Sequence, residues 1–93
     1  MNKSLVEKII REKLDFETDY GTMSRVDKIS FVDDESLDFD IVEVFFNRLN
    51  FIDIEKVNQL AASFGSFKTQ IAAMENEALC VIFYCERNNT DQV

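Results

Sequence analysis

Hydrophobic and polar positions along the chain predict two helices and four strands. The clearest pattern is an uncharged apolar run over residues 78–85, followed by the charged residues Glu86 and Arg87. Eight residues is short for a helix, and the run is rich in β-branched and aromatic side chains. We therefore expect a strand that is buried on both faces. The other elements must then cover this strand.

An amphipathic helix is predicted over residues 4–14, because apolar side chains recur there with helical spacing. Ser4 and Glu7 have the spacing of a capping box at its start. The polar stretch that follows shows no period and contains a glycine, so we expect a loop. Tyr20 and Met23 in this loop are expected to contact the core.

A second helix is predicted over residues 54–64. Asp53 is its expected N-cap, and Ile52 and Val57 occupy the positions of a hydrophobic staple. Gly65 follows the last periodic residue and is free to adopt the left-handed conformation that ends many helices. Both ends of this helix are therefore well marked.

Residues 25–46 favour a β-hairpin that turns at the acidic cluster 33–36. Apolar and polar residues alternate on both sides of the cluster, and Asp-Phe-Asp at 38–40 makes the second strand clear. An alternative is that residues 37–49 are helical, because apolar residues there also recur with helical spacing: Leu37, Ile41, Val44, Phe45 and Leu49.

With a further strand at 67–73, the expected order is αββαββ, an α+β fold with a four-stranded antiparallel sheet and two helices on one face. Moving the last strand to the front would give the ferredoxin-like order, so this is a circularly permuted ferredoxin-like arrangement. The strands of Ile41 and Cys80 are expected at the centre. Those of Ile29 and Ile71, which carry more polar residues, are expected at the edges.

The length of 93 residues fits a single domain, residues 1–93, with a polar tail at 88–93 expected to fray. We expect a cytoplasmic protein, because the first residues do not resemble a signal peptide and the longest apolar run is too short to span a membrane. Cys80 and Cys85 are five residues apart in one strand. They should therefore point to opposite faces as buried free thiols.

No catalytic, cofactor-binding or metal-binding motif stands out. The chain has no histidine, which excludes Ser-His and Cys-His pairs and histidine-based metal sites. The acidic cluster lacks the glycine and the spacing of a calcium loop, and the two glycines are isolated rather than part of a phosphate loop. We therefore expect a protein that is not an enzyme and needs no cofactor.

Charge is distributed unevenly. Residues 12–43 contain eleven acids and three bases and so carry the whole net charge of −8, while the remaining residues carry seven of each sign. This makes direct nucleic-acid binding unfavourable and suits a protein partner with a basic surface. The residues expected to bind this partner are Asp33, Asp34, Glu35, Asp38, Asp40, Glu17 and Asp19. The alternative is that these acids only keep a phenylalanine-rich protein soluble.

Asp38 and Asp40 add a geometric reason for a nucleic-acid mimic. On a strand they would project from one face about 6.6 Å apart, at roughly 3.3 Å per residue. Two steps along a DNA strand cover about 6.8 Å. In composition only, the chain is similar to the small acidic inhibitors of phages and mobile elements, some of which imitate nucleic acid. The function expected is therefore that of a small acidic binding protein, such as an inhibitor of that type, that occupies a basic macromolecular surface.

The sheet face away from the helices offers a second candidate surface. If Ile29, Phe31, Phe39, Ile41, Ile71 and Phe83 face the helices, the other face presents an apolar patch, which is typical of an association site. Its members are Val42, Val44, Phe46, Ile82 and Tyr84, with Cys80 beside them. The alternative function is therefore a structural or assembly protein that forms a homodimer through this face.

Overall fold

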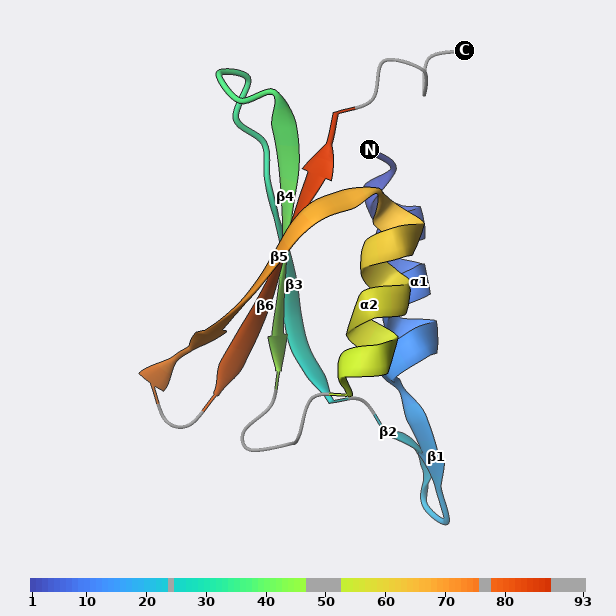
Figure 1. Ribbon diagram of the computed structural model, residues 1–93. Helices are drawn as coiled ribbons and strands as arrows, with labels where there is room; N and C mark the ends of the chain where they lie inside the picture. The colour runs from blue at the N-terminus through green and yellow to red at the C-terminus, as the bar shows by residue number, and fades with distance from the viewer. Residues whose placement is uncertain (24, 47–52, 76–77, 88–93) are drawn as a thin grey trace.

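The computed structural model describes residues 1–23, 25–46, 53–75 and 78–87, and its main sheet and its two helices form two layers (Figure 1). Its elements, in chain order, are α1 (Lys3–Leu14), β1 (Phe16–Thr18), β2 (Gly21–Met23), β3 (Val26–Val32), β4 (Phe39–Phe46), α2 (Ile54–Phe64), β5 (Ser66–Ala73) and β6 (Leu79–Glu86). The predicted staple residue Ile52 and the tail 88–93 lie outside the described residues.

The main sheet has four antiparallel strands in the order β3-β4-β6-β5, which confirms the predicted α+β fold. The strands of Ile41 and Cys80 are central and those of Ile29 and Ile71 form the edges, as expected. Residues 39–46 are a strand and not a helix. Each of their positions pairs with β6, from Phe39 opposite Glu86 to Phe46 opposite Leu79.

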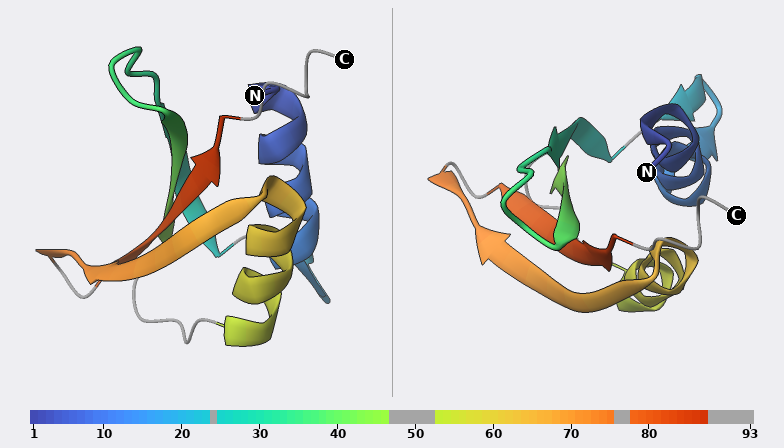
Figure 2. Two further views of the ribbon diagram at one scale, coloured as in Figure 1. Left: turned by 45° about the horizontal axis from the view of Figure 1, so that its top comes forward. Right: turned by 90° about the horizontal axis from the view of Figure 1, so that it is seen from above.

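Both helices lie on the same side of the sheet (Figure 2). The predicted caps of α2 are confirmed: the Asp53 carboxylate accepts from the amides of Glu55 and Lys56, and Gly65 ends the helix at φ 65°. The predicted N-cap of α1, Ser4, is wrong by two residues, and the helix begins at Lys3. Asn2 is the N-cap, and its side chain accepts a hydrogen bond of 3.1 Å from the Leu5 amide. Ser4 lies within the first turn, where its hydroxyl cannot cap the helix.

The stretch after α1 is a short hairpin of β1 and β2 and not a plain loop. The Thr18 hydroxyl accepts from the Tyr20 amide and donates to the Gly21 carbonyl, which fixes the turn. The prediction that Tyr20 and Met23 contact the core is wrong. The Tyr20 side chain is 97% exposed and Met23 is 49% exposed, because the hairpin extends beyond the sheet and helices (Figure 1).

The hydrophobic core lies between the helices and the inner sheet face. Ile10 of α1 and Leu60 of α2 are buried against alternate residues of the central strands. Those inner-face residues are Val42, Val44 and Phe46 of β4 and Val81, Phe83 and Cys85 of β6. The opposite face of the sheet carries no described helix or strand (Figure 2). This open face carries the candidate site.

Candidate functional site

Three rows of paired residues form the open face, read from β3 through β4 and β6 to β5. One row is Lys28, Phe45, Cys80 and Ala72; the next is Ser30, Glu43, Ile82 and Gln70; the third is Val32, Ile41, Tyr84 and Lys68. Residues directly opposite on neighbouring strands share a face, so these twelve side chains form one surface. Its centre is mainly apolar, and its two lysines lie on the edge strands.

This register corrects the predicted composition of the open face. Val42, Val44 and Phe46 were expected there, but they are 0%, 1% and 4% exposed and belong to the core beneath the helices. Ile82 and Tyr84 do lie on the open face, where both are half-buried. Phe39 and Ile41 were expected to face the helices. The alternation of side chains along β4 instead places both of them on the open face, outside the core.

An aromatic cluster lies at one end of the open face. The Phe39 ring meets Phe67 edge-on at a centroid distance of 5.7 Å and Tyr84 at 5.9 Å, and Phe67 lies 6.4 Å from Tyr84. Phe67 belongs to an irregularity between Ser66 and Lys68, where β5 has an extra residue relative to β6. The extra residue brings a phenylalanine that is 54% exposed next to the two half-buried rings.

Lysines cover two rings of the open face. The Lys28 ammonium lies 4.7 Å from the centroid of Phe45, and the Lys68 ammonium lies 5.3 Å from that of Tyr84. The Tyr84 hydroxyl also donates to the Gln70 side-chain oxygen at 2.7 Å. These contacts hold the aromatic side chains in place and leave the rows with one more positive than negative charge, since Glu43 is their one acid.

The acidic turn between β3 and β4, residues 33–38, adjoins the aromatic cluster because Phe39 directly follows Asp38. Asp33 forms an ion pair with Lys3 of α1. The Asp34 carboxylate accepts hydrogen bonds from the Ser36 hydroxyl at 2.6 Å and the Ser36 amide at 2.9 Å, and these bonds lower the pKa of Asp34. Glu35 and Asp38 are exposed.

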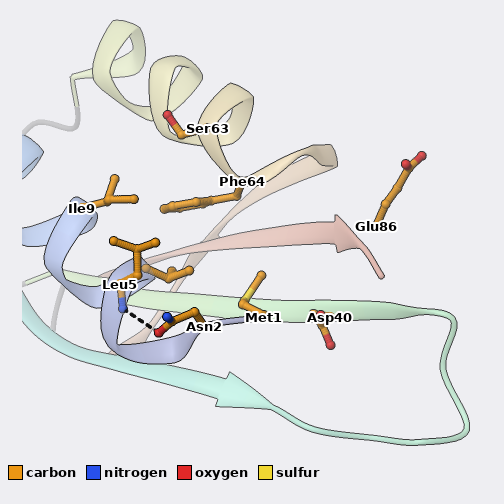
Figure 3. A pocket seen from close by; sticks show the side chains of 9 residues that line it. Met1, Asn2, Leu5, Ile9, Asp40, Ser63, Phe64 and Glu86 are labelled. Atoms are coloured by element: carbon orange, nitrogen blue, oxygen red, sulfur yellow. Dashed lines mark hydrogen bonds between the residues drawn. The ribbon is translucent and has the colours of Figure 1, made fainter. Parts of the chain in front are cut away.

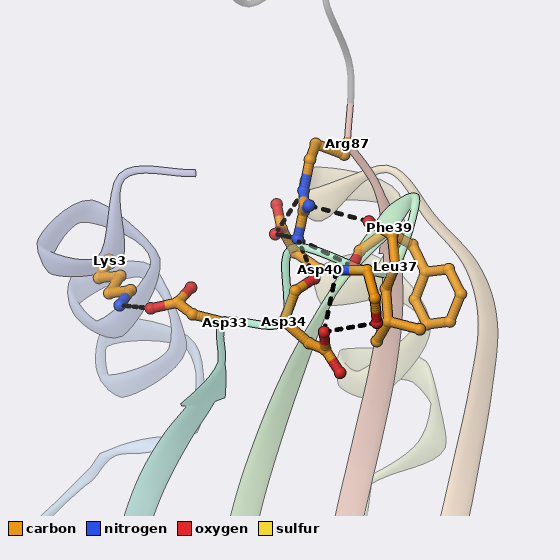
Figure 4. A network of polar contacts seen from close by, with 8 residues as sticks. Lys3, Asp33, Asp34, Leu37, Phe39, Asp40 and Arg87 are labelled. Atoms are coloured by element: carbon orange, nitrogen blue, oxygen red, sulfur yellow. Dashed lines mark hydrogen bonds and ion pairs between the residues drawn. The ribbon is translucent and has the colours of Figure 1, made fainter.

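Arg87, directly after β6, holds the acidic turn in one conformation (Figure 4). Its guanidinium donates to the Asp40 carboxylate at 2.8 and 3.1 Å, to the Leu37 carbonyl at 2.9 Å and to the Phe39 carbonyl at 3.2 Å. The Asp40 side chain is only 15% exposed. A planar guanidinium is suited to this arrangement because its donors are fixed relative to one another. Sequence reasoning missed this role of Arg87.

The predicted acidic residues therefore do not form one surface. Glu17 and Asp19 belong to the β1–β2 hairpin, at the opposite end of the molecule from the β3–β4 turn (Figure 1). The predicted pair of Asp38 and Asp40 is also not presented as expected. Asp38 precedes β4, and Asp40 is directed to its ion pair with Arg87. This removes the geometric argument for a mimic of the DNA backbone.

A small cleft opens between the start of α1, the end of α2 and the sheet (Figure 3). Its volume is about 260 Å³, and its walls include Leu5, Ile9, Phe64, Asp40 and Glu86. This volume lies below the roughly 300–1,000 Å³ of sites for drug-sized ligands. Within the described residues, no group of three side chains is arranged to hold a metal ion.

The two cysteines face opposite sides of the sheet, as predicted. Cys80 pairs with Phe45 on the open face, and Cys85 pairs with Asp40 on the inner face. Both are free thiols and are 2% and 0% exposed. Burial raises the pKa of both thiols, and that of Cys85 reaches about 11. Since the thiolate is the nucleophilic form, neither side chain is reactive at neutral pH.

Comparisons with models of protein families, with curated proteins and with solved structures find no match for this chain. Within the described residues, neither helix has the length and apolar character needed to cross a membrane.

Proposed function

We propose that the protein is a small, non-enzymatic binding protein that docks on another protein through the aromatic cluster and the acidic turn beside it. The observation that carries this proposal is Phe67, a phenylalanine that is 54% exposed and in ring contact with Phe39 and Tyr84. Exposed aromatic side chains held in a fixed geometry are typical anchors of protein interfaces.

The acidic turn supports a basic partner. Residues 33–40 contain five carboxylates, of which Asp33 pairs with Lys3 and Asp40 pairs with Arg87, so three negative charges remain in this segment. The five are Asp33, Asp34, Glu35, Asp38 and Asp40. Because Arg87 and the Ser36 hydrogen bonds already order the turn, binding would cost little conformational entropy. A partner surface with arginine or lysine beside apolar side chains fits both parts of the site.

We propose a partner with a basic surface, as expected from the sequence, but we no longer propose that the protein imitates nucleic acid. Glu35 and Asp38 are exposed, as are Asp33 and Asp34, and these acids lie in a turn and do not repeat along a strand. The inert thiols support a role outside catalysis. Location in the cytoplasm stays a prediction.

Binding to a basic partner can be measured with two labelled peptides, an oligolysine and a peptide that alternates arginine with leucine. Glu35→Gln/Asp38→Asn should weaken binding of both peptides about fivefold at low salt, since each exposed ion pair contributes roughly 0.5 kcal/mol. Phe67→Ser should weaken binding of the arginine-leucine peptide only. Fluorescence anisotropy at several salt concentrations would measure these effects, and binding should weaken as salt rises.

Glu17→Gln/Asp19→Asn is the matched control, because it removes the same charge from the hairpin at the other end of the molecule. This variant should bind both peptides like the original protein. Equal losses for the two double variants would mean that only total charge matters, and the proposed site would then be wrong.

A further inference from the structure

β5 is an exposed edge of the main sheet. It pairs with β6 on one side, and no other described strand pairs with it on the other (Figures 1 and 2). Six of its eight residues are exposed. An edge strand presents a row of unpaired backbone amides and carbonyls, which another strand can bind.

The sequence of β5 lacks the usual protection of an edge strand. Ser66–Ala73 contains no proline and a single charge, Lys68, and its irregularity lies near its start, before Thr69. The other edge strand, β3, contains Asp27 and Lys28 and leads directly into the acidic turn. Charged residues on an edge disfavour pairing with a further strand, so β5 is the edge that is open to addition.

We propose that β5 pairs antiparallel with β5 of a second copy of this chain, about a two-fold axis at Gln70. The two sheets would then join into one continuous sheet. In this register Thr69 lies opposite Ile71 of the second copy, and Lys68 lies opposite Ala72. The pairing is self-complementary because no like charges face each other and β-branched side chains meet across the new ladder.

The charge distribution favours a second copy as the occupant. The net charge of −8 comes from residues 12–43, whereas β5 and β6 together carry one positive and one negative charge, Lys68 and Glu86. Two copies can therefore meet at a weakly charged edge of the main sheet. Ile71 is 48% exposed and would be covered by the second copy.

This association goes beyond the proposed function and responds to salt in the opposite direction. Two copies with the same net charge repel each other, and salt screens that repulsion. Dimerisation should therefore strengthen as salt rises, whereas binding of a basic peptide should weaken. Failure of one proposal can thus be distinguished from failure of the other.

Cross-linking tests the register. Residues directly opposite in an antiparallel pair have Cα atoms about 4.5–5.5 Å apart, which suits a disulfide. Gln70→Cys should therefore give a covalent dimer on mild oxidation, and Thr69→Cys should cross-link at least tenfold more slowly because it meets its own copy only diagonally. Ser30→Cys is the control, since Ser30 ends the same row of the sheet at the β3 edge. The native cysteines are buried and should not compete.

Sedimentation tests the interface itself. Ile71→Lys should weaken the dimer at least tenfold, while Ile54→Lys, at a side chain of similar exposure on α2, should leave it unchanged. A chain that stays monomeric at its solubility limit, a dimer insensitive to Ile71→Lys, or preferential cross-linking through Ser30→Cys would each overturn the proposal. If circular dichroism finds Ile71→Lys unfolded, the cross-linking comparison decides.

Discussion

Burial raises the pKa of the Cys85 thiol to about 11, and the nearby Asp40 carboxylate adds to this rise. A thiol in the unfolded chain has a pKa of about 8.5. As the pH increases, the Cys85 thiol therefore loses its proton at a lower pH in the unfolded chain than in the folded protein. The stability that the protonated thiol contributes is complete below about pH 8.5 and is lost as the pH rises toward the folded-state pKa.

We predict that the free energy of unfolding falls between pH 8 and pH 10, as measured by urea denaturation, and that the fall is smaller in Cys85→Ala at the same two pH values. In the native protein, both thiols should resist a water-soluble thiol reagent at pH 8 and react after denaturation. Rapid reaction of Cys85 in the folded state would contradict its burial.

The acidic turn is an element whose conformation depends on one distant side chain. Arg87 lies 47 residues from Asp40 in sequence, yet it joins the end of β6 to both ends of the turn, through the Asp34 carbonyl at 3.5 Å and the Leu37 carbonyl at 2.9 Å. Sequence periodicity could not reveal this role, because an arginine after a strand has the same pattern whether it faces solvent or a turn. Arg87 comes next to these carbonyls only when β4 and β6 have paired.

Arg87→Gln should destabilise the fold by about 1–2 kcal/mol, because several hydrogen bonds to a partly exposed cation are lost together. Lys8→Gln is the control, since the Lys8 side chain is an exposed cation that pairs with Glu12 along one helix. That variant should lie within about 0.5 kcal/mol of the original protein. Chemical denaturation measures both, and equal effects would show that Arg87 has no special role.

The positions of the helices and strands are easier to predict from the sequence than the side of each strand that faces the core. The α2 boundaries were predictable because Asp53 and Gly65 act locally, through a side-chain cap and a positive φ. The side of β4 that faces the core was not predictable, because the strand is apolar on both sides, with Ile41 and Phe45 on one face and Val42 on the other. In such a strand the choice of inner face depends on pairing with β6. Glu43 lies on the same face of β4 as Ile41, and its charge was the one feature of the sequence that indicated which face is open.

The β1–β2 hairpin was missed for a different reason. Its strands have three residues each, so they are too short to establish an alternating pattern. The sequence shows where the acidic residues lie along the chain, but it does not show which of them lie close together in the fold. The fold places the β1–β2 hairpin and the β3–β4 turn at opposite ends of the molecule, and no local pattern contains that information.

At the scale of the whole molecule, stability should be greatest at the central strand β6. Val81 and Phe83 are 0% and 1% exposed and lie between two paired strands. Their amides should exchange with solvent only through global unfolding, as should that of Ile82. Amides of the β1–β2 hairpin, such as Thr22, should exchange much faster. Hydrogen exchange measured by NMR tests this order, and rapid exchange at Val81 would mean that β6 is not central.

The small cleft has a consequence for the topology of the chain. Met1 and Glu86 both line it, so the start of α1 and the end of β6 are neighbours in space. A short peptide could therefore close the backbone into a ring with the sheet unchanged. Opening that ring between β5 and β6 would give β6-α1-β3-β4-α2-β5, with the small hairpin inserted after α1. The same packed layers thus correspond to two chain orders that differ only in where the ring is cut.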